Sequence, residues 1–101
     1  MNEGTLKSKV VVTSCRKIEG KHVTVGGADL AINGEFAISG LIVVRRDTGL
    51  AVKFPWRVEE KKGGEKEYLD VCYPLSLEAR QAVSSLVIQE FETKYGEGLA
   101  T

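Results

Sequence analysis

The sequence predicts an α+β domain, with a five-stranded antiparallel meander followed by one C-terminal amphipathic helix. Three observations lead to this class. Short β-branched segments with alternating polarity fill most of the chain before residue 74. The turns between them are too short for the crossovers that parallel strands need. An apolar repeat of three and four residues then follows near the C-terminus.

The first two strands are expected over residues 6–15 and 22–32. The first segment is rich in valine and alternates with lysine, and the turn that follows it centres on Gly20. Gly26 and Gly27 interrupt the second strand, as glycine does at a bulge or at a close approach between backbones.

The clearest turn signal is the dipeptide Asn33-Gly34, because both residues tolerate the positive φ of a two-residue hairpin turn. A third strand is expected to run from there over residues 35–45. Asp47 and Gly49 then favour another tight turn.

A fourth strand is expected over residues 50–56. Pro55 has no amide proton for a ladder, so this strand should end there or lie at an edge of the sheet. A charged turn over residues 59–64 leads into the fifth strand, residues 66–73, which Pro74 closes.

The helix is expected to begin after Ser76, a good N-cap, with Glu78 in the first turn where the helix dipole favours negative charge. It should continue to Lys94 and stop at Gly96. The apolar stripe expected to face the sheet consists of Ala79, Ala82, Val83, Leu86, Val87 and Phe91.

The chain of 101 residues is long enough for one core and too short for two. A single domain is expected over residues 6–95, with a flexible N-terminus over residues 1–5 and a flexible tail over residues 96–101. No apolar run approaches a membrane span and the N-terminus lacks the apolar core of a secretory signal, so we expect no membrane partner and a cytoplasmic location.

Catalytic and metal-binding chemistry have little support in the sequence. Cys15 and Cys72 have no CxxC spacing and no clustered histidine, so they are read as buried free thiols, with a disulfide as the alternative. His22 is the sole histidine and is read as an exposed strand residue. Glu59 and Glu60 lie in a solvated turn among lysines. We expect no catalytic residue, no metal and no cofactor.

The charges are polarised along the chain although the formal net charge is zero. Residues 45–66 carry seven Lys or Arg against four Asp or Glu, and residues 1–22 carry five against two. Acidic residues dominate from Glu67 onward. A basic segment can therefore meet phosphates even though the whole chain is neutral.

Three stretches carry a family resemblance: "INGEFAISGLIVV", "TGLAVKFPWR" and "EYLDVCYPLS", followed by an arginine at the start of the helix. In order and spacing they resemble the stage V sporulation protein G (SpoVG) family of bacterial septation and gene regulators. The likeness covers the chain from Leu6 to Tyr95.

The resemblance implies a dimer formed through strands that binds DNA and RNA and adjusts gene expression or division. It places nucleic-acid contact in the segment after Pro55 and at the entry to the helix. The residues expected to meet phosphates are Lys53, Arg57, Lys61, Lys62, Lys66 and Arg80. Trp56 is the candidate for stacking on a base.

Alternatives remain open for each of these residues. Trp56 can instead be a core anchor at the end of the fourth strand, and the lysines can serve only solubility. Arg80 can pair with Glu78 or Asp70 as easily as it can reach a phosphate. The alternative function is a protein-interaction module that acts on division or regulation without direct nucleic-acid binding.

A homodimer is also expected on physical grounds. One helix covers only part of a five-stranded sheet, which leaves strand edges and apolar surface without cover. The predicted mass in sedimentation is therefore twice the 11.0 kDa of the monomer.

Overall fold

A computed structural model describes residues 6–19 and 23–96 of the chain. Four strands form an antiparallel sheet in the order β1-β2-β3-β4, so each strand pairs with its neighbour in sequence. Their bounds are Val10–Lys17 (β1), Thr24–Ile32 (β2), Phe36–Arg46 (β3) and Gly49–Lys53 (β4). The predicted α+β class and the meander are confirmed for these strands.

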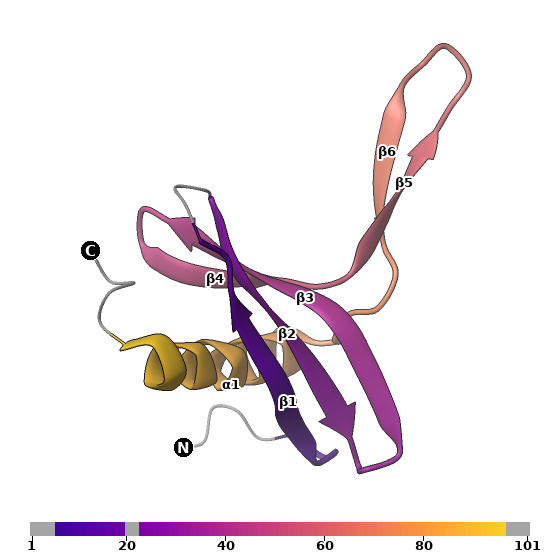
Figure 1. Ribbon diagram of the computed structural model, residues 1–101. Coiled ribbons are helices and arrows are strands. Elements are labelled where there is room, and N and C mark those ends of the chain that lie inside the picture. Colours follow the sequence, from indigo (N-terminus) through magenta and orange to yellow (C-terminus); the bar gives the residue numbers. More distant parts are fainter. Residues whose placement is uncertain (1–5, 20–22, 97–101) are drawn as a thin grey trace.

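One helix, α1 (Leu77–Tyr95), lies across one face of this sheet (Figure 1). Ser76 caps it as predicted, because its Oγ accepts a hydrogen bond from the amide of Ala79 at 3.0 Å. Gly96 ends it with φ 73° and donates its amide to the carbonyl of Glu92.

The core lies between α1 and the sheet. The helix contributes Val83, Val87 and Phe91, and the two last are fully buried. The predicted apolar stripe is therefore the face that α1 buries, with Ala79 and Leu86 half-buried at its margins. Residues of the core on the sheet side are Cys15, Val25, Ala28, Leu30, Leu41, Val43 and Phe54.

The remaining two strands do not join this sheet. Within the described part of the chain, β5 (Trp56–Glu60) and β6 (Lys66–Asp70) pair only with each other. They form a hairpin that projects from the body, here called the arm, residues 56–70 (Figure 1). The prediction of a single five-stranded sheet is wrong on this point. The described residues form six strands, and the predicted fifth strand, residues 66–73, is β6 of the arm and ends at Asp70.

The chain leaves the sheet at the junction of β4 and β5. β4 stops at Lys53, an edge strand as Pro55 required, and Phe54 turns into the core with 6% of its surface exposed. Pro55 cannot donate to a ladder, so the extended chain starts a new strand at Trp56 instead of continuing the old one. Trp56 was wrongly placed at the end of the fourth strand.

The turn at Asn33-Gly34 is confirmed, whereas Glu59 and Glu60, predicted to lie in the charged turn, are the last two residues of β5. Asn33 and Gly34 have φ values of 54° and 68°, the two positive values that a type I′ turn requires. The first strand begins later than predicted, at Val10, and the carboxamide of Asn33 accepts a hydrogen bond from the amide of Lys9 at 2.8 Å.

Gly26 and Gly27 lie inside one continuous strand, so the predicted interruption of β2 does not occur. The predicted bulge and the close approach do occur. The β2–β3 register shifts between Thr24 and Gly26, and a Cβ on Gly26 would collide with the carbonyl of Arg16 and the ring of Phe91. Glycine is needed here because β1 and α1 both approach the strand closely.

Several predictions concern residues outside the described ranges. These are the flexible N-terminus over residues 1–5, the flexible tail over residues 96–101 apart from Gly96, the turn at Gly20 and the exposed position of His22. Both described cysteines are free thiols, with Cys15 buried and Cys72 half-buried. Within the described ranges, no helix has the length and apolar character needed to cross a bilayer.

Candidate nucleic-acid interface

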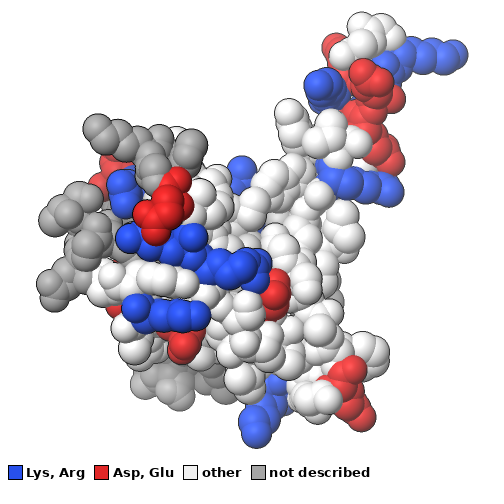
Figure 2. Space-filling view, in the orientation of Figure 1, with Lys and Arg blue, Asp and Glu red and all other residues white. Residues whose placement is uncertain are grey.

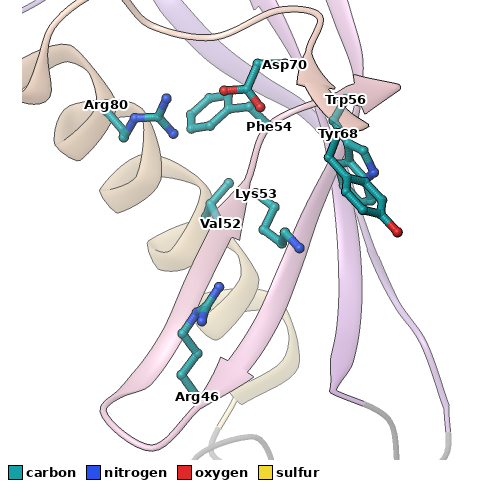
Figure 3. Close-up of a pocket in the computed structure, with 8 residues that line it drawn as sticks. All are labelled: Arg46, Val52, Lys53, Phe54, Trp56, Tyr68, Asp70 and Arg80. Carbon is teal, nitrogen blue, oxygen red and sulfur yellow. The ribbon is translucent and has the colours of Figure 1, made fainter. Parts of the chain in front are cut away.

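A pocket of about 580 Å³ opens where the arm leaves the body (Figure 3). We call it the cradle. Its lining residues are Arg46, Val52, Lys53, Phe54, Trp56, Tyr68, Asp70 and Arg80. Three cations, three aromatic rings and one carboxylate thus meet at one place on the surface.

Five elements bring these side chains together. Arg46 ends β3, and Lys53 ends the antiparallel neighbour β4. Trp56 and Asp70 form the first cross-strand pair of the arm, at its root. Arg80 lies in the first turn of α1, where its amide bonds to the carbonyl of the N-cap Ser76 at 3.0 Å.

The three cations of the cradle have no carboxylate partner among the residues that the structure describes. The ammonium of Lys53 lies 4.9 Å from the centre of the Trp56 ring. The guanidinium of Arg80 lies 5.1 Å from the centre of the Phe54 ring. Because aromatic faces attract cations without neutralising them, the positive charge stays available to an incoming anion.

Arg80 therefore does not pair with either of its predicted acidic partners in the described structure. Asp70 also has no ion pair or hydrogen bond through its carboxylate within the same ranges. The two groups line the same pocket and flank Phe54 (Figure 3).

The arm has two different faces, since successive side chains of a strand point to opposite sides. Trp56 and Val58 lie opposite Asp70 and Tyr68 and share the face that enters the cradle. Arg57 points to the other face. Trp56 and Arg57, adjacent in sequence, therefore do not act side by side.

The cations along the arm are partly neutralised. Arg57 forms an ion pair with Glu59 at 2.9 Å, and Lys61 forms one with Glu67 at 3.0 Å. Lys62 and Lys66 are exposed near the tip. Figure 2 shows the result as Lys and Arg side chains interspersed with carboxylates along the arm.

The predicted residues thus divide into two groups. Lys53, Trp56 and Arg80 meet in the cradle, whereas the four other predicted cations lie along the arm away from it. Trp56 is half-buried, which is neither the core position nor the fully exposed position that the sequence left open.

Sequence reasoning missed Arg46, Tyr68 and Asp70 as members of the site. The alternation within "WRVEE" and "KEYLD" was a usable signal, because it places Trp56 and Tyr68 on one face once the two segments pair. Nothing local pointed to Arg46, which reaches the cradle only through the β3–β4 pairing.

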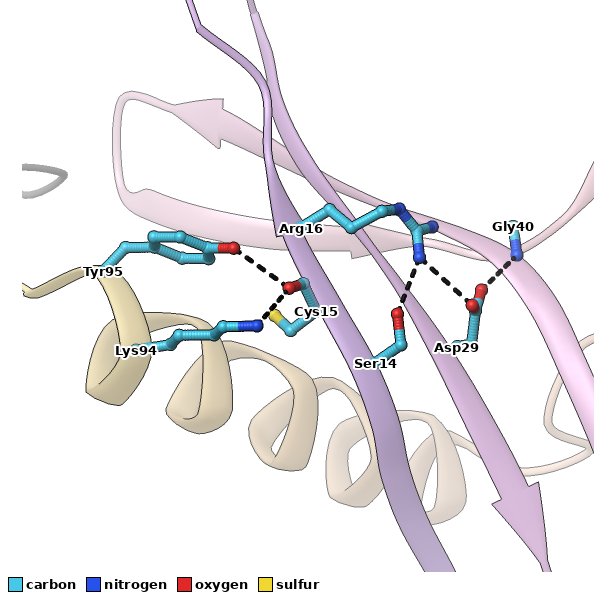
Figure 4. A network of polar contacts seen from close by, with 7 residues as sticks. All are labelled: Ser14, Cys15, Arg16, Asp29, Gly40, Lys94 and Tyr95. Carbon is cyan, nitrogen blue, oxygen red and sulfur yellow. Dashed lines mark hydrogen bonds and ion pairs between the residues drawn. The ribbon is translucent and has the colours of Figure 1, made fainter.

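A second group of polar residues has a structural role on the body of the molecule (Figure 4). The β2–β3 register shifts between Ala28 and Leu30, and Asp29 lies at this bulge. Its carboxylate accepts hydrogen bonds from the Gly40 amide at 3.2 Å and from Arg16 at 3.1 Å. The Arg16 hydrogen bond, with smaller help from Gly40, lowers the pKa of Asp29 below its ordinary value.

The end of α1 is tied to β1 in the same region. The carbonyl of Cys15 accepts hydrogen bonds from Lys94 Nζ at 2.9 Å and from the Tyr95 hydroxyl at 3.0 Å. Burial raises the pKa of the Cys15 thiol, so it stays protonated and unreactive. Arg16 and Lys94 are thereby committed to holding the fold.

The segment between the arm and the helix, together with the first residue of α1, exposes apolar side chains at every second position. This apolar row consists of Val71, Tyr73, Leu75 and Leu77, exposed to 59%, 48%, 94% and 68%. A run of large apolar side chains facing water is typical of a protein contact surface.

Comparison with known proteins identifies the family. The SpoVG family model matches residues 8–93, which is most of the chain. The chain belongs to the SpoVG family.

Its relatives carry names that refer to septation. A protein of Lachnoclostridium phytofermentans named "Putative septation protein SpoVG" is 28% identical over 80 residues, covering 79% of this chain and 80% of the relative. One of the same name from Clostridium beijerinckii is 24% identical over 82 residues, covering 81% and 86%. "Putative septation protein SpoVG 2" of Listeria monocytogenes is 28% identical over 74 residues, covering 73% and 68%.

Proposed function

We propose that this member of the SpoVG family is a cytoplasmic, non-enzymatic bacterial regulator of septation and gene expression. It acts as a homodimer and binds DNA or RNA through the arm and the cradle at its root. One observation carries the proposal: Arg46, Lys53 and Arg80 line one pocket, and none of them is neutralised by a carboxylate among the described residues.

Unpaired cations in a concave site favour phosphate, because affinity for nucleic acid comes largely from cations that displace condensed counterions. The formal net charge is zero and the arm carries its own carboxylates, so the proposal rests on the three cations of the cradle, which share the pocket with one carboxylate, Asp70. In the arm, Lys62 and Lys66 can extend the contact along a strand, whereas Arg57 and Lys61 must first leave their carboxylates.

Two features of the surface support the proposal of a homodimer. A lone two-stranded hairpin is marginally stable in water, and the arm has no other strand beside it in the described structure. The apolar row is continuous with the arm and exposes four large side chains. A second copy of the chain covers both, and two-fold symmetry doubles the cradles.

The test is the salt dependence of binding, measured by fluorescence anisotropy with a labelled duplex and a labelled single strand. Each phosphate contact contributes about 0.7 to 0.9 to the slope of log affinity against log salt. The triple variant Arg46→Gln/Lys53→Gln/Arg80→Gln should reduce this slope by about two to three. The matched control, Lys7→Gln/Lys9→Gln/Lys17→Gln, removes three exposed cations from outside the cradle.

Lys61→Gln/Lys62→Gln tests the arm tip separately, at about one unit of slope per lost phosphate contact. A protein that binds neither probe, or binds with no salt dependence, would contradict direct nucleic-acid recognition. It would favour the second candidate function, a protein-interaction module, which the apolar row supports.

A further inference from the structure

The cradle differs from an ordinary basic patch in the aromatic rings beside its cations. Resting on the proposed function, we propose that the cradle binds one unpaired nucleotide of single-stranded DNA or RNA and that Asp70 recognises its base as guanine. The protein would therefore bind single strands in preference to duplexes, and would prefer strands that carry an unpaired guanine.

The size and composition of the pocket suit one nucleotide. Its volume of about 580 Å³ falls within the range of sites for small ligands, about 300 to 1,000 Å³. Arg46 and Lys53 are exposed at opposite ends of the β3–β4 ladder and supply charge for the backbone phosphates on either side of the nucleotide. The rings supply apolar surface for the base.

Tyr68 is the more accessible stacking platform. It lies on the cradle face of the arm with 68% of its surface exposed, whereas Trp56 is half-buried with the Lys53 ammonium over its ring. A base within a duplex is already stacked on both faces and must be extruded before it can stack on a side chain. A base in a single strand has a free face at little cost, which is why the cradle favours single strands.

Asp70 gives the pocket a preference among bases. Its carboxylate lines the cradle without a hydrogen-bond or ion-pair partner in the described structure, and an ionised carboxylate can only accept hydrogen bonds. Guanine presents two adjacent donors, N1–H and the exocyclic amino group, which match the two carboxylate oxygens. Each of the other bases places an acceptor next to its donor on the same edge, so a carboxylate meets repulsion there.

The experiment uses labelled thymine strands of about 12 nucleotides, within the usual site sizes for single-strand binding proteins. One strand carries a central guanine, one is all thymine, one has an abasic centre, and the fourth probe is the guanine strand in a duplex. Binding is followed by anisotropy and by the fluorescence of Trp56, the only tryptophan of the chain.

The guanine strand should bind more tightly than the all-thymine strand, by about fivefold to a hundredfold, the range for one bidentate base contact. The abasic strand and the duplex should bind more weakly than the guanine strand. Trp56 fluorescence should change with the guanine strand and not with the duplex, because only an unpaired base enters the cradle.

Two variants separate stacking from base recognition. Tyr68→Ser should weaken binding of the guanine strand about fivefold to a hundredfold. Its control, Phe36→Ser, removes an equally exposed ring (70%) at the start of β3, outside the cradle, and should change nothing. Asp70→Asn should abolish the difference between the guanine and all-thymine strands without weakening binding of the latter.

The outcomes distinguish this inference from the proposed function. Salt-dependent binding that is equal for duplex and single strand, with constant Trp56 fluorescence, overturns the nucleotide pocket and leaves nucleic-acid binding standing. Equal affinity for the guanine and all-thymine strands overturns the role of Asp70. Absence of salt-dependent binding to every probe overturns the proposed function itself.

Discussion

At the scale of single residues, the close contacts around Gly26 lead to the sharpest prediction about stability. A Cβ at this position would meet the carbonyl of Arg16 and the ring of Phe91, and the backbone and the buried ring have little room to move. Gly26→Ala should lower the free energy of unfolding by about 1 to 3 kcal/mol, the usual cost of overpacking a core.

Urea unfolding followed by circular dichroism measures this change. The control is Gly27→Ala, whose Cβ would come closest to the Arg16 guanidinium at 3.1 Å and to the Leu41 carbonyl at 3.3 Å. Because both of these distances exceed 3.0 Å whereas the contacts at Gly26 are shorter, the control should cost less. Equal effects at the two positions would contradict the close contact between β2 and α1.

Asp29 makes a prediction about pH. Its carboxylate bridges Arg16 and the Gly40 amide, and its pKa in the folded protein lies below the ordinary value of 3.8. A carboxyl group whose pKa is lowered by folding stabilises the folded state at pH values above its ordinary pKa. This stabilisation is lost as the pH falls through the lowered pKa. Asp29→Asn should therefore cost about 0.5 to 1 kcal/mol at neutral pH, since the ion pair is partly exposed.

The difference between wild type and Asp29→Asn should shrink as pH falls below 3.8 and then vanish. Denaturant unfolding at a series of pH values measures it. Thr48→Ala, at an exposed position in the β3–β4 turn, changes no ionisable group and is the control. A pH-independent difference would mean that Asp29 acts through shape and not through charge.

At the scale of elements, the sequence predicted what local chemistry determines. The Asn33-Gly34 turn, the Ser76 cap and the Gly96 stop each depend on a few adjacent residues, and all three are confirmed. The departure of the arm from the sheet was missed. Pro55 shows that a strand must end, but nothing local shows whether the next strand returns to the same sheet.

The cradle was predicted in part for the same reason. Lys53, Trp56 and Arg80 lie in or beside the segments that the family resemblance pointed to. Arg46 and Tyr68 become neighbours of these residues only through the pairing of β3 with β4 and of β5 with β6. Register across a sheet is a long-range property, so adjacency of this kind could not be read from one sequence.

Shortening the arm tests which part of it binds nucleic acid. Replacing residues 59–67 by Asn-Gly would join Val58 to Tyr68, which already face each other across the hairpin, through a favourable two-residue turn. The shortened protein keeps the cradle and loses the tip cations. Its free energy of unfolding should change by less than about 0.5 kcal/mol, because the removed residues lie on the surface of the arm.

Nucleic-acid affinity should fall only modestly in the shortened protein if the cradle is the principal site. Anisotropy and urea unfolding measure the two quantities on the same sample. A complete loss of binding with the fold intact would move the site from the cradle to Lys61, Lys62 and Lys66 near the tip of the arm.

At the scale of the whole molecule, the apolar row predicts the oligomeric state. Leu75 and Leu77 are exposed to 94% and 68%, and burying a leucine side chain contributes about 1.5 to 3 kcal/mol. A two-fold dimer buries two copies of each leucine. Replacing both leucines should therefore cost several kcal/mol of association free energy. Wild type should sediment at twice 11.0 kDa, and Leu75→Ser/Leu77→Ser at 11.0 kDa.

Val23→Ser is the control, because Val23 is similarly exposed (69%) and lies just before β2, outside the row. It should leave the dimer intact. The monomeric variant keeps one complete cradle, so a short guanine strand should still change its Trp56 fluorescence. It should lose affinity only for strands long enough to reach two cradles, since linking two sites raises the effective concentration at the second. A wild-type protein that sediments as a monomer would remove this avidity, and each cradle would then have to bind on its own.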